Sequence, residues 1–308
     1  MIAASLATPV AEFLPPDGLD ARVLGSSRSA VYVDCGFVLA ITARDVPAMP
    51  DGIVLSGSSI TRPPPRGSPA RVSRARIDLT GMSIDLGPAR DWHPDVPANL
   101  DRDAGEVSRR GRGLLRNCRV SPATDVDVLL RSLAATAGLK VISDEGGRAG
   151  VASLLTAVRF RDRHRAGRAA EALLGRGGGL TPEADDLIGA TVAATFAFGA
   201  ACRFTGRARA EFADALVPGD LRLRTNSLSA TLVELAATGR VVEPVQKIMD
   251  LSLPPERWRA HLRRLVTIGH STGRAWAIGC GVSALLLAEG AGSRPERVPW
   301  AQRPDQGG

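Results

Sequence analysis

Residues 175–202, GRGGGLTPEADDLIGATVAATFAFGAAC, indicate how the C-terminal two thirds of the chain fold. A glycine-rich loop leads into an apolar segment, and residues 187–202 carry no charge at all. This run is shorter than the roughly 20 residues that a helix needs to span a bilayer. The pattern therefore predicts a helix over residues 182–202 that is buried in a protein core rather than in a membrane.

The sequence on both sides of this stretch also has helical periodicity. Apolar residues recur three and four positions apart, which is the spacing of one buried helix face. We expect an all-α domain over residues 125–291, followed by a flexible tail at residues 292–308 that is rich in proline, arginine and glycine. The helices are expected at residues 126–138, 151–174 (with a charged interruption at 159–165), 182–202, 208–216, 227–238, 242–251, 255–267 and 273–288.

The N-terminal residues 1–95 have a different pattern. Their apolar runs are short, rich in β-branched residues and separated by turn signals, as in antiparallel strands. Asp34-Cys35-Gly36 predicts a tight hairpin between the first two runs. We therefore expect a small antiparallel β domain, sandwich-like or barrel-like, and an α+β fold for the whole chain. The strands are expected at residues 30–34, 37–42, 52–55, 75–79 and 82–86.

Residues 96–124 are expected to connect the two domains. This segment holds several arginines close together: Arg109, Arg110, Arg112, Arg116 and Arg119. Two interpretations stay open here. The segment is either a connector with a solvated basic face or a surface that faces an anion or a partner.

The composition sets limits on the class of function. Of 308 residues, 44% are hydrophobic and 23% charged, which is typical of a globular protein and argues against disorder. The net charge is +7, but aromatic residues make up only 4%, too few to stack on single-stranded nucleic acid. The arginines are also spread along the whole chain. A nucleic-acid-binding function is therefore the least favoured class, and we expect no nucleic-acid partner.

The cysteines and the N-terminus indicate where the protein works. Cys35, Cys118, Cys202 and Cys280 are far apart, without a CxxC pair or metal-ligand spacing. Residues 1–16 lack the basic and apolar regions of a signal peptide. We expect a soluble cytoplasmic protein with reduced thiols and no membrane partner.

The glycine-rich loop has two interpretations. Thr181 is a suitable N-cap, Pro182 suits the first helical position, and a carboxylate at Glu183 is favoured by the helix dipole. An ordinary helix start has these features too. The run Gly177-Gly178-Gly179 is longer than a turn needs, and glycines let backbone N–H groups approach an anion. The loop lacks the Gly-Lys-Ser/Thr ending of a P-loop, which argues against a nucleotide-binding motif.

Two further polar helix starts stand out. Residues 268–279 (IGHSTGRAWAIG) are similar to the first segment, because Gly179 and Gly189 have the same spacing as Gly269 and Gly279. Residues 223–230 (LRTNSLSA) form the other, which also fits an ordinary capping motif. Three such starts predict a site for a small anion, with the helix starts facing one pocket. The alternative is that the similarity between the segments at residues 179–189 and 269–279 is a coincidence.

These segments resemble a known family, the oxamate carbamoyltransferase subunit of the AllH type from allantoin degradation. The family's Gly-x-Gly-Pro-Gly-Leu-Thr-Pro-Ser-Gly-Asp-Asp motif corresponds here to residues 175–186. Residues 225–230 and 269–273 match its later motifs, and residues 21–57 resemble its opening strands. This sequence departs from the family at Gly178, at Glu183-Ala184 and at Arg274-Ala275.

The resemblance implies carbamoyl transfer between carbamoyl phosphate and oxamate, which forms or cleaves oxalurate, carried out with other subunits. The implied partners are a small anionic metabolite and those subunits. Such chemistry needs hydrogen-bond donors aimed at phosphate and carboxylate oxygens. The resemblance assigns anion binding to Thr181 and to the backbone of Gly177, Gly178 and Gly179. The groups that position the substrate are Thr225, Asn226, Ser229, Ser271, Thr272 and Gly273.

His270 and Asp186 are the candidate catalytic residues. The pKa of a histidine lies near neutrality, so His270 suits a proton donor or a polarising group, although a lone histidine is more often structural. Asp185 and Asp186 either hold the loop, bind Mg²⁺ or accept a substrate amide proton, and no other cofactor is expected. A non-catalytic, ligand-binding subunit of the same kind of complex is the alternative function, favoured by the departures from the motif.

Overall fold

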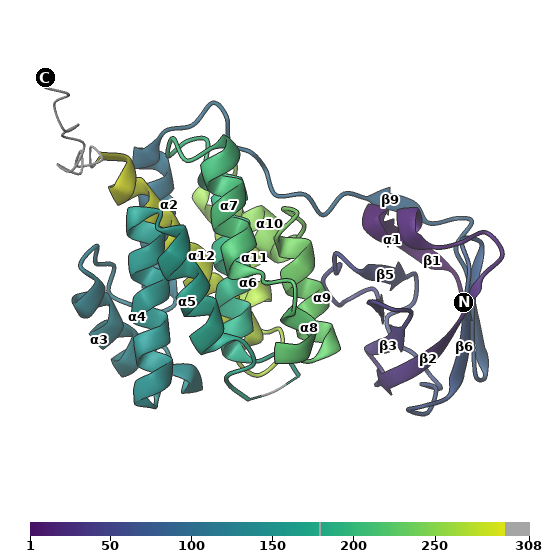
Figure 1. Ribbon diagram of the computed structural model, residues 1–308. Coiled ribbons are helices and arrows are strands. Elements are labelled where there is room, and N and C mark those ends of the chain that lie inside the picture. Colours follow the sequence, from purple (N-terminus) through teal and green to yellow (C-terminus); the bar gives the residue numbers. More distant parts are fainter. Residues whose placement is uncertain (179, 293–308) are drawn as a thin grey trace, which may run out of the picture.

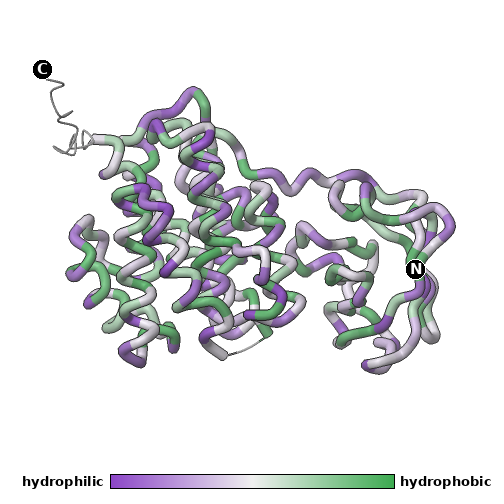
Figure 2. Tube along the Cα trace, in the orientation of Figure 1, coloured by the Kyte–Doolittle hydropathy of each residue, from purple (hydrophilic) through white to green (hydrophobic). Residues whose placement is uncertain are grey.

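The computed structural model describes residues 1–178 and 180–292. Figure 1 shows two parts side by side, a β part formed by the N-terminal 92 residues and a helical part beyond it. The segment that joins them is mainly hydrophilic (Figure 2). The expected α+β fold, with strands first and helices after, is confirmed. The tail expected at 292–308 lies, beyond Gly292, outside the described residues.

The β part is one nine-stranded sheet in the order β8-β7-β6-β2-β3-β4-β5-β1-β9. Most neighbours are antiparallel, as expected, but β4 pairs with β5 and β1 with β9 in parallel, which alternation of apolar residues does not reveal. The sheet closes around buried aliphatic side chains such as Val31, Leu39 and Ile53. Its elements are β1 Ala3–Ala7, α1 Thr8–Phe13, β2 Leu19–Ser26, β3 Ala30–Asp34, β4 Val38–Thr42, β5 Gly52–Leu55, β6 Pro69–Val72, β7 Arg76–Leu79, β8 Met82–Asp85 and β9 Arg90–Trp92.

The hairpin predicted at residues 34–36 is confirmed. β3 and β4 pair in antiparallel register from Asp34 and Val38 onward. Gly36 has a positive φ of 84°, and its N–H donates to the Asp34 carboxylate at 3.0 Å. A residue with a side chain rarely adopts that backbone conformation, so the glycine is required by the turn.

The helical part is built around α6 and α12, which pack against each other and are buried on nearly every side. Gly189 and Gly279 make this packing possible: a Cβ at Gly189 would lie 2.9 Å from the Trp276 ring, and one at Gly279 would lie 2.6 Å from the Ala190 Cβ. The helices are α2 Ala104–Asn117, α3 Val126–Thr136, η1 Lys140–Ile142, α4 Glu145–Phe160, α5 Arg163–Leu173, α6 Glu183–Phe198, α7 Gly206–Leu216, α8 Leu221–Arg224, α9 Ser227–Ala236, α10 Glu243–Met249, α11 Pro255–Leu265 and α12 Thr272–Gly292.

Helix α12 is long and apolar enough to cross a membrane by length and composition alone. In this structure 72% of its most apolar stretch is buried inside the protein. Its hydropathy therefore agrees with its position in the core, between α2 and α6.

Helix α2 lies in the segment that the sequence led us to regard as a connector. Asp103 and Glu106 form a capping box at its start, and Val107, Leu114 and Leu115 are buried against the other helices. A Cβ at Gly111 would lie 2.8 Å from the Gly281 carbonyl oxygen of α12. Because arginines occupy the positions between these apolar residues, the composition of the segment does not indicate that one face of the helix is buried.

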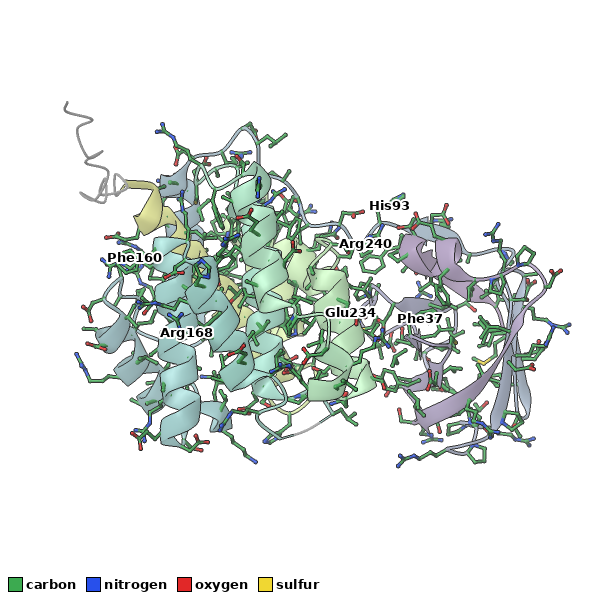
Figure 3. All side chains as sticks on the ribbon, viewed as in Figure 1. Phe37, His93, Phe160, Arg168, Glu234 and Arg240 are labelled. Atoms are coloured by element: carbon green, nitrogen blue, oxygen red, sulfur yellow. The ribbon has the colours of Figure 1, made fainter. Side chains whose placement is uncertain are left out.

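The two parts meet where the β3–β4 hairpin contacts α8 and α9. Val38 N–H donates to the Thr231 hydroxyl at 3.3 Å, and the Arg222 guanidinium donates to the Gly36 carbonyl at 3.2 Å. Figure 3 shows Phe37 on the β part facing Glu234 of α9 across this junction. The junction positions the start of α9, which contributes to the site described next.

Candidate functional site

The glycine-rich loop runs from the end of α5 to the start of α6. Gly175 and Gly177 have positive φ angles of 79° and 110°. A Cβ at Gly177 would lie 2.7 Å from the Glu183 backbone nitrogen, whereas one at Gly178 would meet no atom within 4 Å. The loop therefore folds closely over the first turn of α6. Gly179 lies outside the described residues.

The expectation that Thr181 caps α6 is wrong. The helix begins at Glu183, and Pro182 occupies the capping position without a side-chain cap. The Ala184 N–H is satisfied by the Arg176 carbonyl at 3.2 Å, so the loop backbone replaces the missing cap. This leaves the buried Thr181 hydroxyl for another partner, the Asp186 carboxylate, to which it donates at 3.2 Å.

Asp185 ties the loop to α9. Its fully buried carboxylate accepts hydrogen bonds from the Gly175 N–H at 2.8 Å, from the Ser229 hydroxyl at 2.7 Å and from the Thr225 hydroxyl. Three donors compensate for the removal of this charge from water. Asp185 therefore holds the loop, as one of the sequence hypotheses proposed.

Asp186 ties the first turn of α6 to α12. Besides the Thr181 hydroxyl, it accepts a hydrogen bond from the Trp276 indole N–H at 3.0 Å. Burial raises the pKa of Asp186 well above its ordinary value; hydrogen bonds from Trp276 and Thr181 oppose this effect, and the nearby Asp185 charge adds to it. Asp186 therefore favours its neutral form more than an exposed carboxyl does.

The start of α12 joins the same group of side chains. The hydroxyl oxygens of Thr181 and Thr272 lie 2.7 Å apart, within hydrogen-bond distance. The three polar helix starts singled out in the sequence thus converge on one place. We refer to Thr181, Asp185, Asp186, Thr225, Ser229 and Thr272 as the Asp185–Asp186 cluster.

Other predicted site residues lie beside the cluster without joining its hydrogen bonds. Asn226 caps α9 by accepting from the Ser229 N–H at 3.0 Å, and the Gly273 N–H donates to the Ile268 carbonyl at 3.0 Å. Ser271 is half-buried and His270 is exposed. Among the described residues, neither side chain has a hydrogen-bond partner. Gly178 is exposed at the loop.

Three residues that the sequence did not assign to the site support it. The Gly175 N–H and the Trp276 indole each bind one carboxylate of the cluster, and the buried Glu183 carboxylate accepts from the Val141 N–H at 3.1 Å. The sequence did contain a signal for Trp276, which is a tryptophan in a helix of otherwise small residues. A buried indole N–H needs a hydrogen-bond acceptor, so such a residue indicates a polar partner nearby. The sequence marks Gly175 and Glu183 as members of the loop motif, but it does not indicate their hydrogen-bond partners.

Arg274, where the sequence departs from the family pattern, has a structural position. Its guanidinium donates to the Ala137, Cys118 and Thr136 carbonyls at 2.7, 2.8 and 2.9 Å. These carbonyls end α2 and α3, where a cation is favoured by the helix dipole. Arg274 therefore fixes the start of α12 against two neighbouring helices.

The space beside the cluster is small. A cavity of about 30 Å³ lies next to Thr272 and Trp276, which is enough space for a water molecule. Within residues 1–178 and 180–292, no group of three or more histidine, cysteine, aspartate or glutamate side chains is arranged to hold a metal ion. The carboxylates of Asp185 and Asp186 bind protein donors instead.

Part of the chain matches a known protein family. Residues 173–284 match the family model described as oxamate carbamoyltransferase subunit AllH. The matched segment contains all three converging helix starts, and it confirms the family resemblance over residues 173–284, whereas the resemblance of residues 21–57 lies outside the match. No curated protein and no solved structure matches the chain significantly.

Proposed function

We propose that this chain, which is AllH-like over residues 173–284, is a subunit of a carbamoyltransferase complex that acts on oxamate or oxalurate with carbamoyl phosphate or phosphate. The observation that carries the proposal is the convergence of the glycine-rich loop with the starts of α9 and α12 on Asp185 and Asp186. The family match covers this region, and the proposal places the small anion at the outer side of the cluster.

The charges of the cluster are compatible with an anion nearby. Asp185 is surrounded by three donors, and the raised pKa of Asp186 favours its neutral form. Both features reduce the repulsion that two free carboxylates would exert on an anionic substrate. Among the described residues, the Gly177 and Gly178 N–H groups have no acceptor, so they are available to a phosphate or carboxylate oxygen.

The reaction assigns the surrounding groups simple roles. In the direction of oxalurate synthesis, the oxamate nitrogen attacks the carbonyl carbon of carbamoyl phosphate. A C–N bond forms, the C–O bond to phosphate breaks, and the nitrogen loses a proton. The loop N–H groups stabilise the negative charge on the leaving phosphate. The exposed His270 takes up or delivers the proton, and Thr272 positions the substrate.

Binding of the substrates to the purified chain tests the proposal. Oxamate, oxalurate, carbamoyl phosphate and inorganic phosphate are titrated by calorimetry and by thermal shift. We expect binding of at least one of them, weakened by Thr272→Val. Thr238→Val is the matched control, because the exposed Thr238 hydroxyl bonds, among the described residues, the Leu235 carbonyl alone. Absence of binding by the chain and by its reconstituted complex would contradict the proposal.

A non-catalytic, ligand-binding or structural subunit is the second candidate. The observation that favours it is that the hydroxyls of Thr181, Thr225 and Ser229 already donate to carboxylates. Turnover by a reconstituted complex separates the two. His270→Ala lowers the turnover number if this chain provides the proton-transfer group, whereas an unchanged turnover number favours the non-catalytic role.

A further inference from the structure

A second concave site lies between α2 and the segment that leads from α10 into α11. It has a volume of about 570 Å³ and shares no residue with the Asp185–Asp186 cluster. Among the described residues, five arginines line it, Arg109, Arg110, Arg112, Arg116 and Arg259, and Glu106 is the one acidic residue in its lining. The groove contains four of the five arginines for which the sequence left an anion-facing surface open.

Arg110 builds one wall of this groove. Its buried guanidinium donates to the carbonyls of Ile248 at 2.6 Å, Asp250 at 2.9 Å and Leu253 at 3.1 Å. Burial lowers the pKa of Arg110 to about 10, and the nearby Asp250 carboxylate opposes this effect, so the side chain stays charged at neutral pH. These bonds fix the α10–α11 turn against α2.

Trp258 of α11 fixes the second helix in place. Two guanidinium groups lie over its ring, with Arg110 at 5.0 Å and Arg259 at 5.3 Å from a ring centroid. A Cβ at Gly113 would lie 3.1 Å from this ring, so the glycine lets α2 approach it closely. The groove is therefore formed by α2, the start of α11 and the segment that joins α10 to α11.

Three further arginines lie on one exposed face of α2. Arg109, Arg112 and Arg116 are separated by three and four positions, which spans about 10 Å along a helix. Within the described chain none of them has an ion pair or hydrogen bond. The Glu106 carboxylate is already engaged by Arg102 at 3.2 Å and by the Asp103 N–H at 3.2 Å. The described part of the chain thus leaves the positive charge in the groove largely uncompensated.

We propose that this groove binds a nucleoside polyphosphate. Arg109, Arg112 and Arg116 contact the phosphates, because the planar guanidinium matches two phosphate oxygens at once. The nucleoside lies against the apolar side of the groove, formed by Leu251, Leu253 and Pro255. The volume falls in the range of small-molecule sites, which favours a compact ligand over an acidic protein segment or a nucleic acid. The inference does not depend on the carbamoyltransferase proposal.

Calorimetric titration of the full chain with ATP tests this inference, with tripolyphosphate, adenosine, poly-glutamate and duplex DNA as separate arms. We expect ATP to bind, tripolyphosphate to bind more weakly and adenosine not to bind detectably. Arg112→Ala and Arg116→Ala each weaken ATP binding about ten-fold, as loss of a charge-assisted hydrogen bond does. Higher salt weakens ATP binding as well.

The matched control is Arg168→Ala, because Arg168 is an exposed arginine on α5 (Figure 3) and is not part of the groove lining. It should bind ATP as the unmodified chain does, and circular dichroism confirms that all variants are folded. Absence of ATP binding, or equal loss in Arg168→Ala, overturns the inference. Tighter binding of poly-glutamate or DNA than of ATP overturns it too, in favour of a macromolecular partner. A failure here leaves oxamate binding at the other site unaffected, so the two proposals are distinguishable.

Discussion

The hydroxyl oxygens of Thr181 and Thr272 lie 2.7 Å apart although 91 residues separate them in the chain. This contact joins the starts of the two central helices, α6 and α12, and places both next to the Asp186 carboxylate. The Asp185 carboxylate extends the connection to α9. Removing one member of this network should therefore affect several helix starts at once.

We expect Thr181→Ala to destabilise the protein. The change removes one donor to the buried Asp186 and the partner of Thr272, and loss of such a bond costs about 1–2 kcal/mol of unfolding free energy. Urea unfolding followed by circular dichroism measures the effect. Thr238→Ala, at an exposed hydroxyl, should stay within about 0.5 kcal/mol of the unmodified chain. Equal stability of the two variants would show that the Thr181 contact contributes nothing.

The two adjacent aspartates should respond differently to replacement by asparagine. Asp185 accepts from three donors, so Asp185→Asn sets an amide NH₂ against some of them and costs about 2–4 kcal/mol. Asp186→Asn is milder, because the raised pKa of Asp186 shows that its site disfavours the charge. Thermal unfolding at pH 7 compares the variants. A larger loss for Asp186→Asn than for Asp185→Asn contradicts this account.

The sequence was sufficient to predict that the starts of α6, α9 and α12 meet at one site, because glycine spacing and hydroxyl positions are local patterns. The similarity of residues 179–189 and 269–279 predicted two helices that start alike, and the pairing of α6 with α12 agrees with it. The hydrogen-bond partners of the individual side chains were harder to predict. The Thr181 hydroxyl suits an N-cap by sequence, but only the fold shows that the Arg176 carbonyl covers the helix start and Asp186 takes the hydroxyl.

The parts that the sequence missed depend on long-range packing. Helix α2 is rich in arginine, so its composition indicates a solvated connector, yet Gly111 and Leu114 pack against α12. The parallel pairing of β4 with β5 is set by the loop between them rather than by the alternation of apolar residues. The substrate and the roles of His270 and Ser271 stay predictions, because neither side chain has a contact within the described chain that fixes a role.

Asp51 should make stability fall as the pH rises. Its carboxylate is buried just before β5, and neither oxygen has a hydrogen-bond partner among the described residues. Burial raises the pKa of Asp51 from 3.8 to about 7, and the Asp51 charge adds to the effect of burial in raising the pKa of the neighbouring Tyr32. The folded state therefore binds the proton more tightly than the unfolded state does. Its stabilising effect is complete below pH 3.8 and is lost as the pH rises through about 7.

Asp51→Asn removes this dependence. Between pH 5 and pH 8 the variant should gain roughly 2–3 kcal/mol of unfolding free energy relative to the unmodified chain. Chemical denaturation at the two pH values gives the difference. Asp20→Asn, at a carboxylate that is 90% exposed, is the control and should change equally at both pH values. If Asp51→Asn also changes equally at pH 5 and pH 8, the buried carboxyl is not the titrating group.

Gly177 and Gly178 form a matched pair for testing the loop. Gly177 has a φ of 110°, and a Cβ there would lie 2.7 Å from the Glu183 nitrogen, so Gly177→Ala forces the loop away from α6 at a cost of about 1–3 kcal/mol. Gly178→Ala meets no atom within 4 Å and should leave stability nearly unchanged. If the loop N–H groups bind the substrate anion, Gly177→Ala also weakens phosphate or oxamate binding, because the displaced Gly177 and Gly178 amides no longer face the anion. Unfolding curves and calorimetry on the two variants measure both effects, and equal behaviour of the pair would refute the close approach of Gly177 to α6.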